Sequence, residues 1–149
     1  MDEIRFYHET EEFGYLSNYW IAPITVEGVQ WKSTEHYYQA QKTLDLSFAE
    51  KIRHSATCDQ AKNLGNSSQC IYRPDWETKK IEAMNTAIKA KFDQHPSLKA
   101  LLLATGKATL IEDSREDYYW GIGATGSGKN MLGTLLMELR SSYLKNGSN

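Results

Sequence analysis

Helix-start signals followed by segments of helical periodicity constrain the fold of this chain more than any other feature. Ser33 or Thr34 can cap a helix that we expect to reach about Leu44. The segments 47–50 and 57–60 both match the capping-box pattern, in which two side chains bond the first free backbone N–H groups of a helix. The stretch after residue 33 is therefore predicted to be mainly helical.

Periodic apolar residues, with glycine or proline at the ends, indicate the later helices. Gly65 is expected to close the third helix, and Pro96 to open a helix that ends before Gly106. Helices are also predicted over 76–94 and 131–144. The first of these two has a stripe of residues expected to be buried, namely Ile81, Met84, Ile88 and Phe92.

Strand signals are few and short. Residues 4–7 and 109–112 suit single strands, and 24–31 suits a hairpin with Gly28 in its turn. The predicted fold class is therefore mainly α with a few short β-strands. Because 149 residues suit one hydrophobic core, we expect a compact single-domain helical bundle over residues 1–149.

Composition excludes several classes of function. Proteins that mainly bind the nucleic-acid backbone usually carry an excess of basic residues. A net charge of −2 therefore disfavours that function for this chain. No stretch approaches the ~20 apolar residues of a membrane span, and the acidic opening is unlike a secretory signal, so we expect a cytoplasmic protein without membrane contact. Cys58 and Cys70 lack zinc-ligand spacing and are expected to be reduced and structural. We predict no metal and no cofactor.

The segment 113–130 is a long polar, aromatic and glycine-rich loop. Its 121–126 part matches the dinucleotide-binding fingerprint but lacks the surrounding βαβ unit. Its 123–130 part resembles a phosphate-binding P-loop, but Asn130 replaces the hydroxyl residue that binds magnesium. Gly121, Lys129 and the start of the following helix still suit a bound phosphate, and a flexible linker is the alternative.

Glu35 is the first candidate for chemistry. It lies in the first turn of its predicted helix and shares a face with Tyr38 and Gln39, whereas His36 points away and is interpreted as a support for the turn. A carboxylate at this position can also act only as a favourable partner of the helix dipole. Both interpretations stay open on the residues alone.

Asp117 is the second candidate, because three aromatic residues follow it closely. Aromatic walls exclude water and strengthen charge interactions within them, although acids on loops are usually solvated. The chain has four tryptophans and nine tyrosines, and the candidate wall, for which core packing is the alternative, consists of Trp76, Trp120, Tyr37 and Tyr38. Two carboxylates, flat walls and an anion-binding loop suit metal-free hydrolysis of a phosphorylated glycoside of a heterocycle.

Several separated motifs closely resemble the YbiA-like, or NADAR, family. They run in family order from about residue 13 to 144, which is nearly the whole chain. The matching segments are FGYLSNY at 13–19, WKSTEHYYQAQK at 31–42, AKNLG at 61–65, KFDQH at 91–95, DYYWG at 117–121 and GKNMLG at 128–133.

This resemblance implies an N-glycosidase that hydrolyses phosphoribosylamino-pyrimidine intermediates of riboflavin biosynthesis into ribose 5-phosphate and the pyrimidine. Glu35 and Asp117 match acidic positions of the family site and are our predicted catalytic residues. The predicted substrate-binding residues combine the family matches with the residue-based candidates, and they are Asn18, Tyr38, Lys62, Trp76, Trp120, Gly121, Lys129 and Asn130. Ile122 departs from relatives that have an acid at this position, which leaves the substrate preference open.

Two alternatives to this function stand. Other family members remove ADP-ribose from guanine in nucleic acid, so the second reading is an ADP-ribosylglycohydrolase. The third is a non-catalytic module that binds ADP-ribose or NAD, which the two acids disfavour. The expected partner is a small phosphorylated ribosyl-pyrimidine, with ADP-ribosylated guanine as the alternative and no obligate protein partner.

Overall fold

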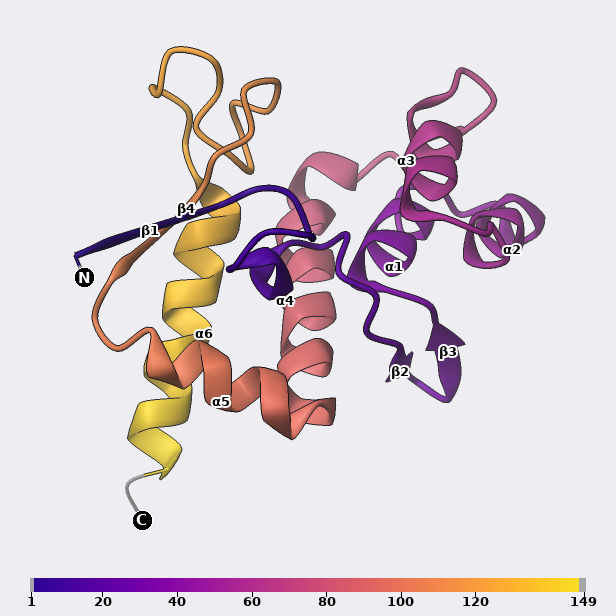
Figure 1. Cartoon of the computed structure of the whole chain (residues 1–149). Helices are drawn as coiled ribbons and strands as arrows, with labels where there is room; N and C mark the ends of the chain where they lie inside the picture. The colour runs from indigo at the N-terminus through magenta and orange to yellow at the C-terminus, as the bar shows by residue number, and fades with distance from the viewer. Residues whose placement is uncertain (1, 148–149) are drawn as a thin grey trace. The chain divides into compact units, whose positions relative to one another are not determined.

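The computed structural model describes residues 2–147 and divides the chain into two compact units. One unit comprises Ile21–Gln94, and the other comprises Met1–Trp20 together with His95–Asn149. Helices dominate both units (Figure 1), so the prediction of a mainly α fold with a few short strands is confirmed. Among residues 2–147, no helix combines the length and the apolar character that a membrane span requires.

The unit built from the two ends of the chain centres on a short parallel strand pair. Strands β1 (Glu3–Phe6) and β4 (Thr109–Glu112) pair in parallel. The long helix α6 (Met131–Gly147) packs on β4, and α5 (Pro96–Ala104) packs on α6 (Figure 1). In β1 the residues alternate between buried and exposed, as expected for a strand with one face on the core. The core of this unit includes Ile4, Phe6, Leu102, Leu110, Leu132 and Leu136. A one-turn 3-10 helix, η1 (Gly14–Leu16), precedes Ser17 and Asn18.

The unit formed by Ile21–Gln94 begins with the predicted hairpin. Strands β2 (Ile24–Val26) and β3 (Val29–Trp31) pair antiparallel. Between them Glu27 and Gly28 have φ angles of 50° and 80°, the left-handed conformations of the tight turn that suits a two-residue hairpin loop. The predicted hairpin is confirmed.

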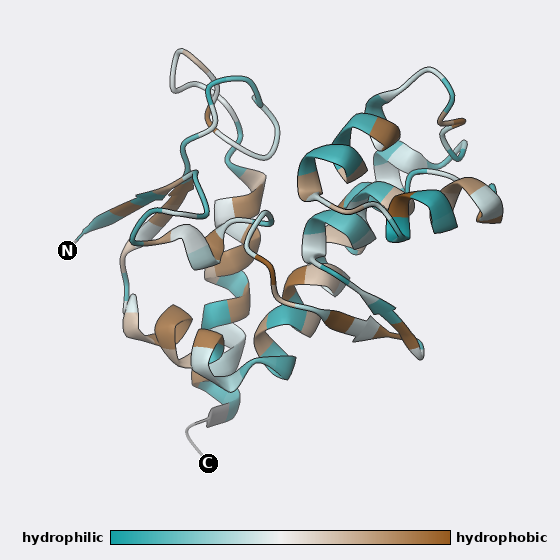
Figure 2. Ribbon diagram, turned by 45° about the vertical axis from the view of Figure 1, so that its right-hand side comes forward, coloured by the Kyte–Doolittle hydropathy of each residue, from teal (hydrophilic) through white to brown (hydrophobic). Residues whose placement is uncertain are grey.

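Four helices complete this unit. They are α1 (Thr34–Ala40), α2 (Leu46–Arg53), α3 (Cys58–Asn66) and α4 (Trp76–Gln94), and α1 packs against each of the other three (Figure 1). The ribbons of α2 and α3 carry much hydrophilic colour in Figure 2, in keeping with their exposed outer faces. On α4, by contrast, Met84, Ile88 and Phe92 of the predicted stripe are buried, whereas Ile81, near the start of the helix, is partly exposed. Helix α1, buried along its whole length, is therefore the central element of this unit.

Several helix boundaries differ from the sequence prediction. Helix α1 ends at Ala40 rather than near Leu44. Helix α2 is capped by Asp45, whose carboxylate accepts the backbone N–H groups of Ser47 and Phe48, so the predicted Ser47 cap is wrong. The carboxylate two residues earlier outcompetes the hydroxyl because a charged acceptor bonds the free N–H groups more strongly.

Gly65 also has a different role from the one predicted. It lies inside α3, which ends at Asn66, so its predicted role as the residue that closes this helix is wrong. Close packing, and not a left-handed backbone, explains the glycine: a side chain here would overlap the carboxamide of Gln39 on α1.

A buried guanidinium joins separate elements of the unit that contains α6. Arg140 is 6% exposed and donates hydrogen bonds of 2.8 Å to Thr105 Oγ1 and to the Ala108 carbonyl. Burial lowers the pKa of this guanidinium, whose hydrogen bonds replace those it would make to water. Arg140 therefore ties α6 to the segment between α5 and β4.

Replacing this residue tests its contribution to stability. We expect Arg140→Met to lower the free energy of unfolding by about 2–3 kcal/mol, because the buried Ala108 carbonyl loses its donor. Urea denaturation measures this loss. The matched control is Arg115→Met, since Arg115 is exposed and its replacement should change stability by less than ~0.5 kcal/mol. Equal effects of the two substitutions on the free energy of unfolding would contradict the stabilising role of the buried Arg140 hydrogen bonds.

Candidate functional site

Glu35 lies in the first turn of α1, and the start of that helix is tightly held. Ser33 is its cap: the hydroxyl accepts the backbone N–H of His36 at 3.2 Å and lies 2.7 Å from His36 Nδ1. His36 Nε2 lies 3.1 Å from the Ser55 carbonyl, which can only accept, so Nε2 carries the hydrogen and Nδ1 accepts from Ser33. Burial lowers the pKa of His36, which favours this neutral form. The interpretation of His36 as a support for the turn is confirmed.

The Glu35 carboxylate itself is buried, with 7% of the residue exposed. Its Oε2 accepts a 2.6 Å hydrogen bond from Gln39 Nε2, one turn later on α1. A carboxylate removed from water in this way needs hydrogen bonds to stay ionised, and Gln39 supplies one. Sequence reasoning placed Gln39 on the same face as Glu35 but did not select it, although its spacing of four residues was a usable signal.

Aromatic side chains lie on the same helix. Tyr38 packs against Trp76 at the start of α4, with ring centroids 5.3 Å apart, and both residues are largely buried. Tyr72 adds a second contact to Trp76 at 6.4 Å. The structure thus brings together two of the four aromatic residues proposed as a wall, in the unit that contains Glu35.

Lys42 is a buried cation at the end of this aromatic group. Its ammonium lies 5.7 Å from the ring centroid of Tyr38 and 5.4 Å from that of Tyr72, and it donates a 2.8 Å hydrogen bond to Asn66 Oδ1. Such contacts stabilise an ammonium withdrawn from water. Lys62, the remaining predicted site residue of this unit, is exposed on α3.

The other predicted site residues belong to the unit that contains α6. Asp117 is partly exposed, and its Oδ1 accepts the backbone N–H groups of Tyr119 and Trp120 at 2.9 and 2.8 Å. This double acceptance shapes the turn that carries the buried Trp120. Asn18 follows η1 and is also buried.

The glycine-rich loop is ordered by its own backbone. The N–H groups of Gly123, Gly128 and Asn130 all donate to carbonyls within the segment 114–122. The N–H groups that begin α6 donate to the carbonyls of Tyr119 and Trp120. These donors are therefore engaged within the protein, and among the predicted phosphate-binding groups the Lys129 ammonium is the one presented at the surface.

Asn130 joins this loop to the strand pair. Its Nδ2 donates to the Leu110 carbonyl, and its Oδ1 accepts the Glu112 N–H, both at 2.9 Å. Its backbone N–H bonds the carbonyl of Gly121 at 2.9 Å. The side chain of Asn130 is thus hydrogen-bonded to two residues of β4. The substrate-binding role predicted for Asn130 and Gly121 stays a prediction.

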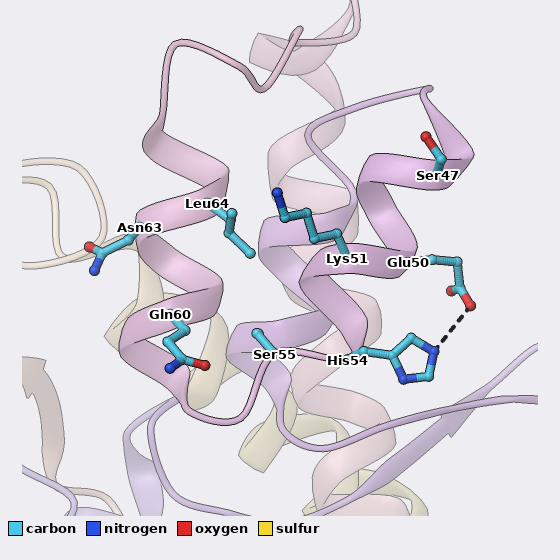
Figure 3. Close-up of a pocket in the computed structure, with 8 residues that line it drawn as sticks. All are labelled: Ser47, Glu50, Lys51, His54, Ser55, Gln60, Asn63 and Leu64. Carbon is cyan, nitrogen blue, oxygen red and sulfur yellow. Dashed lines mark ion pairs between the residues drawn. The ribbon is translucent and has the colours of Figure 1, made fainter.

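A pocket of ≈ 650 Å³ opens between α2 and α3 (Figure 3). Leu64 and Lys51 extend into the space between the two helices in this view. On its α2 side His54 Nε2 lies 3.6 Å from a carboxylate oxygen of Glu50. No predicted site residue lines this pocket, whose lining residues are Ser47, Glu50, Lys51, His54, Ser55, Gln60, Asn63 and Leu64.

Comparison with known proteins gives this chain its family. The NADAR domain family matches residues 5–143. N-glycosidase YbiA of Escherichia coli strain K12 is 46% identical over 137 residues, which cover 92% of this chain and 86% of that protein. A riboflavin biosynthesis protein of Vibrio vulnificus, VVA0006, is 42% identical over 92% of this chain but only 37% of its own length.

A solved structure agrees with this relationship. The NMR structure of E. coli YbiA superposes with a TM-score of 0.92 at 42% sequence identity, covering 99% of this chain and 88% of that one. The resemblance inferred from the sequence motifs is therefore confirmed, and the chain belongs to the NADAR domain family.

Proposed function

We propose that this protein hydrolyses the C–N glycosidic bond of phosphoribosylamino-pyrimidine intermediates of riboflavin biosynthesis. The reaction class follows from its relatives: proteins 45–46% identical to it over most of its length are N-glycosidases, and by that similarity the chain is an N-glycosidase. The substrate class is supported by the riboflavin biosynthesis proteins of Vibrio vulnificus and Zea mays that it resembles at 42% and 36% identity.

The buried carboxylate of Glu35, held by Gln39 at 2.6 Å, is the observation that carries the mechanism. As the C–N bond breaks, positive charge develops on the sugar carbon, and a nearby carboxylate stabilises that charge. Water adds its hydroxyl to this carbon and gives its remaining proton to the departing amine, so that ribose 5-phosphate and the aminopyrimidine are formed. Glu35 serves as the base that polarises the water or as the charge that stabilises the sugar.

Asp117 is the second carboxylate of the proposal. Its Oδ1 already accepts two backbone N–H groups, so Oδ2 is the oxygen that would contact a leaving group or a ribose hydroxyl. Trp76 and Tyr38 supply flat apolar surfaces of the kind that hold a heterocycle.

A direct assay tests the proposed substrate. The purified protein is incubated with a phosphoribosylamino-pyrimidine, and separately with DNA carrying ADP-ribosylated guanine, and the released base or sugar is measured by chromatography. We expect turnover of the pyrimidine substrate. Turnover of the DNA substrate alone would make the protein an ADP-ribosylglycohydrolase, and turnover of neither would contradict both assignments.

Lys129 provides a prediction about recognition of the phosphate. Its ammonium is exposed and lies 5.7 Å from the Tyr119 ring centroid, which holds the charge at the surface of the loop. We expect Lys129→Ala to raise KM about 10-fold for the phosphorylated substrate, since one charge-assisted hydrogen bond is worth about 1.5 kcal/mol. Steady-state kinetics measure this change.

Two comparisons make that prediction specific. The dephosphorylated riboside should be processed equally well by Lys129→Ala and by the unaltered protein. Lys107→Ala removes another exposed lysine and should leave KM for both substrates unchanged. A KM that rises to the same extent for both substrates would argue against phosphate binding by Lys129.

A further inference from the structure

The carboxamide of Gln39 is buried in an unusual way. Only 3% of the residue is exposed, and its Nε2 donates to Glu35 Oε2 at 2.6 Å. The other end of the same carboxamide, Oε1, is shielded from solvent and has no hydrogen-bond partner among residues 2–147. A buried acceptor without a donor destabilises the folded protein.

The orientation of this carboxamide suits an ionised Glu35. With Nε2 toward Glu35 the amide donates to a carboxylate, and charge-assisted bonds are the stronger kind. Turning the amide over would set Oε1 against Oε2, two acceptors facing each other at 2.6 Å. The unpaired Oε1 thus accompanies the amide orientation that gives an ionised Glu35 a hydrogen-bond donor.

Gly65 forms the surface behind this amide. A Cβ atom at this position would overlap Gln39 Oε1 and lie 3.1 Å from Gln39 Cβ. A glycine inside a helix is less stable than alanine there, so its presence in α3 calls for a packing reason. That reason is the close approach of α3 to α1 at Gln39, which confines the amide.

We infer that Gln39, backed by Gly65, is a positioning residue that keeps the Glu35 carboxylate ionised and in a single orientation. The inference deepens the proposed function, on which it rests for the catalytic role of Glu35. Gln39 itself takes part in no bond making or breaking. Its effect is to stabilise the charged form of the carboxylate through a hydrogen bond that the protonated form does not need.

Removing the donor gives the first test. We expect Gln39→Leu to lower kcat about 10-fold with KM changed less than two-fold, since one charge-assisted hydrogen bond is lost. The acid limb of the kcat profile should move up by about one pH unit, because the carboxylate then protonates more readily. Gly65→Ala should change the profile in the same direction by displacing the amide.

Replacing the donor with a second acid gives a sharper test. In the Gln39→Glu variant two carboxyl groups face each other and share one proton. The introduced carboxyl group, while protonated, donates to Glu35 as the amide did, and activity is retained at acidic pH. At higher pH both groups ionise, so the profile should acquire a basic limb that the unaltered protein lacks.

The control separates positioning from stability. Thr57→Ala removes the hydroxyl that caps α3 and so destabilises the same unit without altering a contact of Glu35. It should lower thermal stability but leave the pH profile in place. A Gln39→Leu protein that loses stability while its profile stays unchanged would overturn the inference.

A readout without turnover distinguishes this inference from the proposed function. The carboxyl carbon of Glu35 is followed by ¹³C NMR during a pH titration of the unaltered protein, Gln39→Leu and Thr57→Ala. A titration midpoint raised only in Gln39→Leu supports the positioning role even if neither substrate is hydrolysed, in which case the proposed function alone fails. An unchanged midpoint overturns the positioning role whatever the activity.

Discussion

Glu35→Gln is expected to fold normally and to lose N-glycosidase activity by at least ~100-fold. The substitution removes the negative charge but keeps the size of the side chain. It also keeps an amide oxygen that accepts the hydrogen bond from Gln39 Nε2, so α1 retains its structure. Because the developing charge on the sugar is then no longer balanced, the loss should fall on kcat more than on KM.

The measurement combines kinetics with unfolding. Steady-state turnover of the pyrimidine substrate is compared between the unaltered protein, Glu35→Gln and the surface control Glu138→Gln, which changes an exposed carboxylate on α6 in the same way. The free energy of unfolding should agree within about 1 kcal/mol among the three proteins. Near-normal turnover by Glu35→Gln would refute the catalytic assignment of Glu35.

The second large effect we expect is a free energy of unfolding that rises with pH because of Lys91. Lys91 lies on α4, is 1% exposed, and burial lowers the pKa of its ammonium to about 7. In the unfolded chain this group titrates near its ordinary value of ~10.4. Between these two values the unfolded state binds more protons than the folded state, so the free energy of unfolding rises with pH in this window.

The slope of that rise reaches about 1.4 kcal/mol per pH unit. From pH 7 to pH 9 the protein should therefore gain about 2–3 kcal/mol of stability relative to a Lys91→Met variant. Below pH 7 Lys91 is protonated in the folded protein as well as in the unfolded chain. The free energy of unfolding is then lower than that of the variant by its largest amount, and this difference no longer changes with pH.

Comparison with the variant removes the effect of groups that titrate independently of Lys91. Burial raises the pKa of Cys70 and of Tyr72, and as they ionise in the unfolded chain they lower stability at alkaline pH in both proteins. Their effect therefore cancels in the difference between the two urea denaturation series. A difference that does not change between pH 7 and pH 9 would contradict the depressed pKa of Lys91.

Much of the candidate site could be predicted because its signals are local. The place of Glu35 in the first turn of a helix was recognisable from a cap within a few residues, and Asp117 was selected as an acid followed by aromatic residues. The family resemblance then made both of them predicted catalytic residues. The roles of these residues in the reaction stay predictions. The backbone engagement of the glycine-rich loop was not predictable, since its N–H groups bond carbonyls whose approach depends on the fold of the whole segment.

The sequence by itself determined the helical character of this protein, the hairpin at residues 24–31 and membership of the NADAR domain family, because propensities, caps and motif order act over short stretches of chain. Only the tertiary structure decided that Gly65 packs against Gln39, that Lys91 is almost wholly buried, and that Asn130 clasps β4. The first and third are contacts between segments far apart in the chain, and the second is the burial of a side chain by its surroundings. Packing between elements fixes these outcomes, because each depends on contacts between parts of the chain that local patterns do not specify in full.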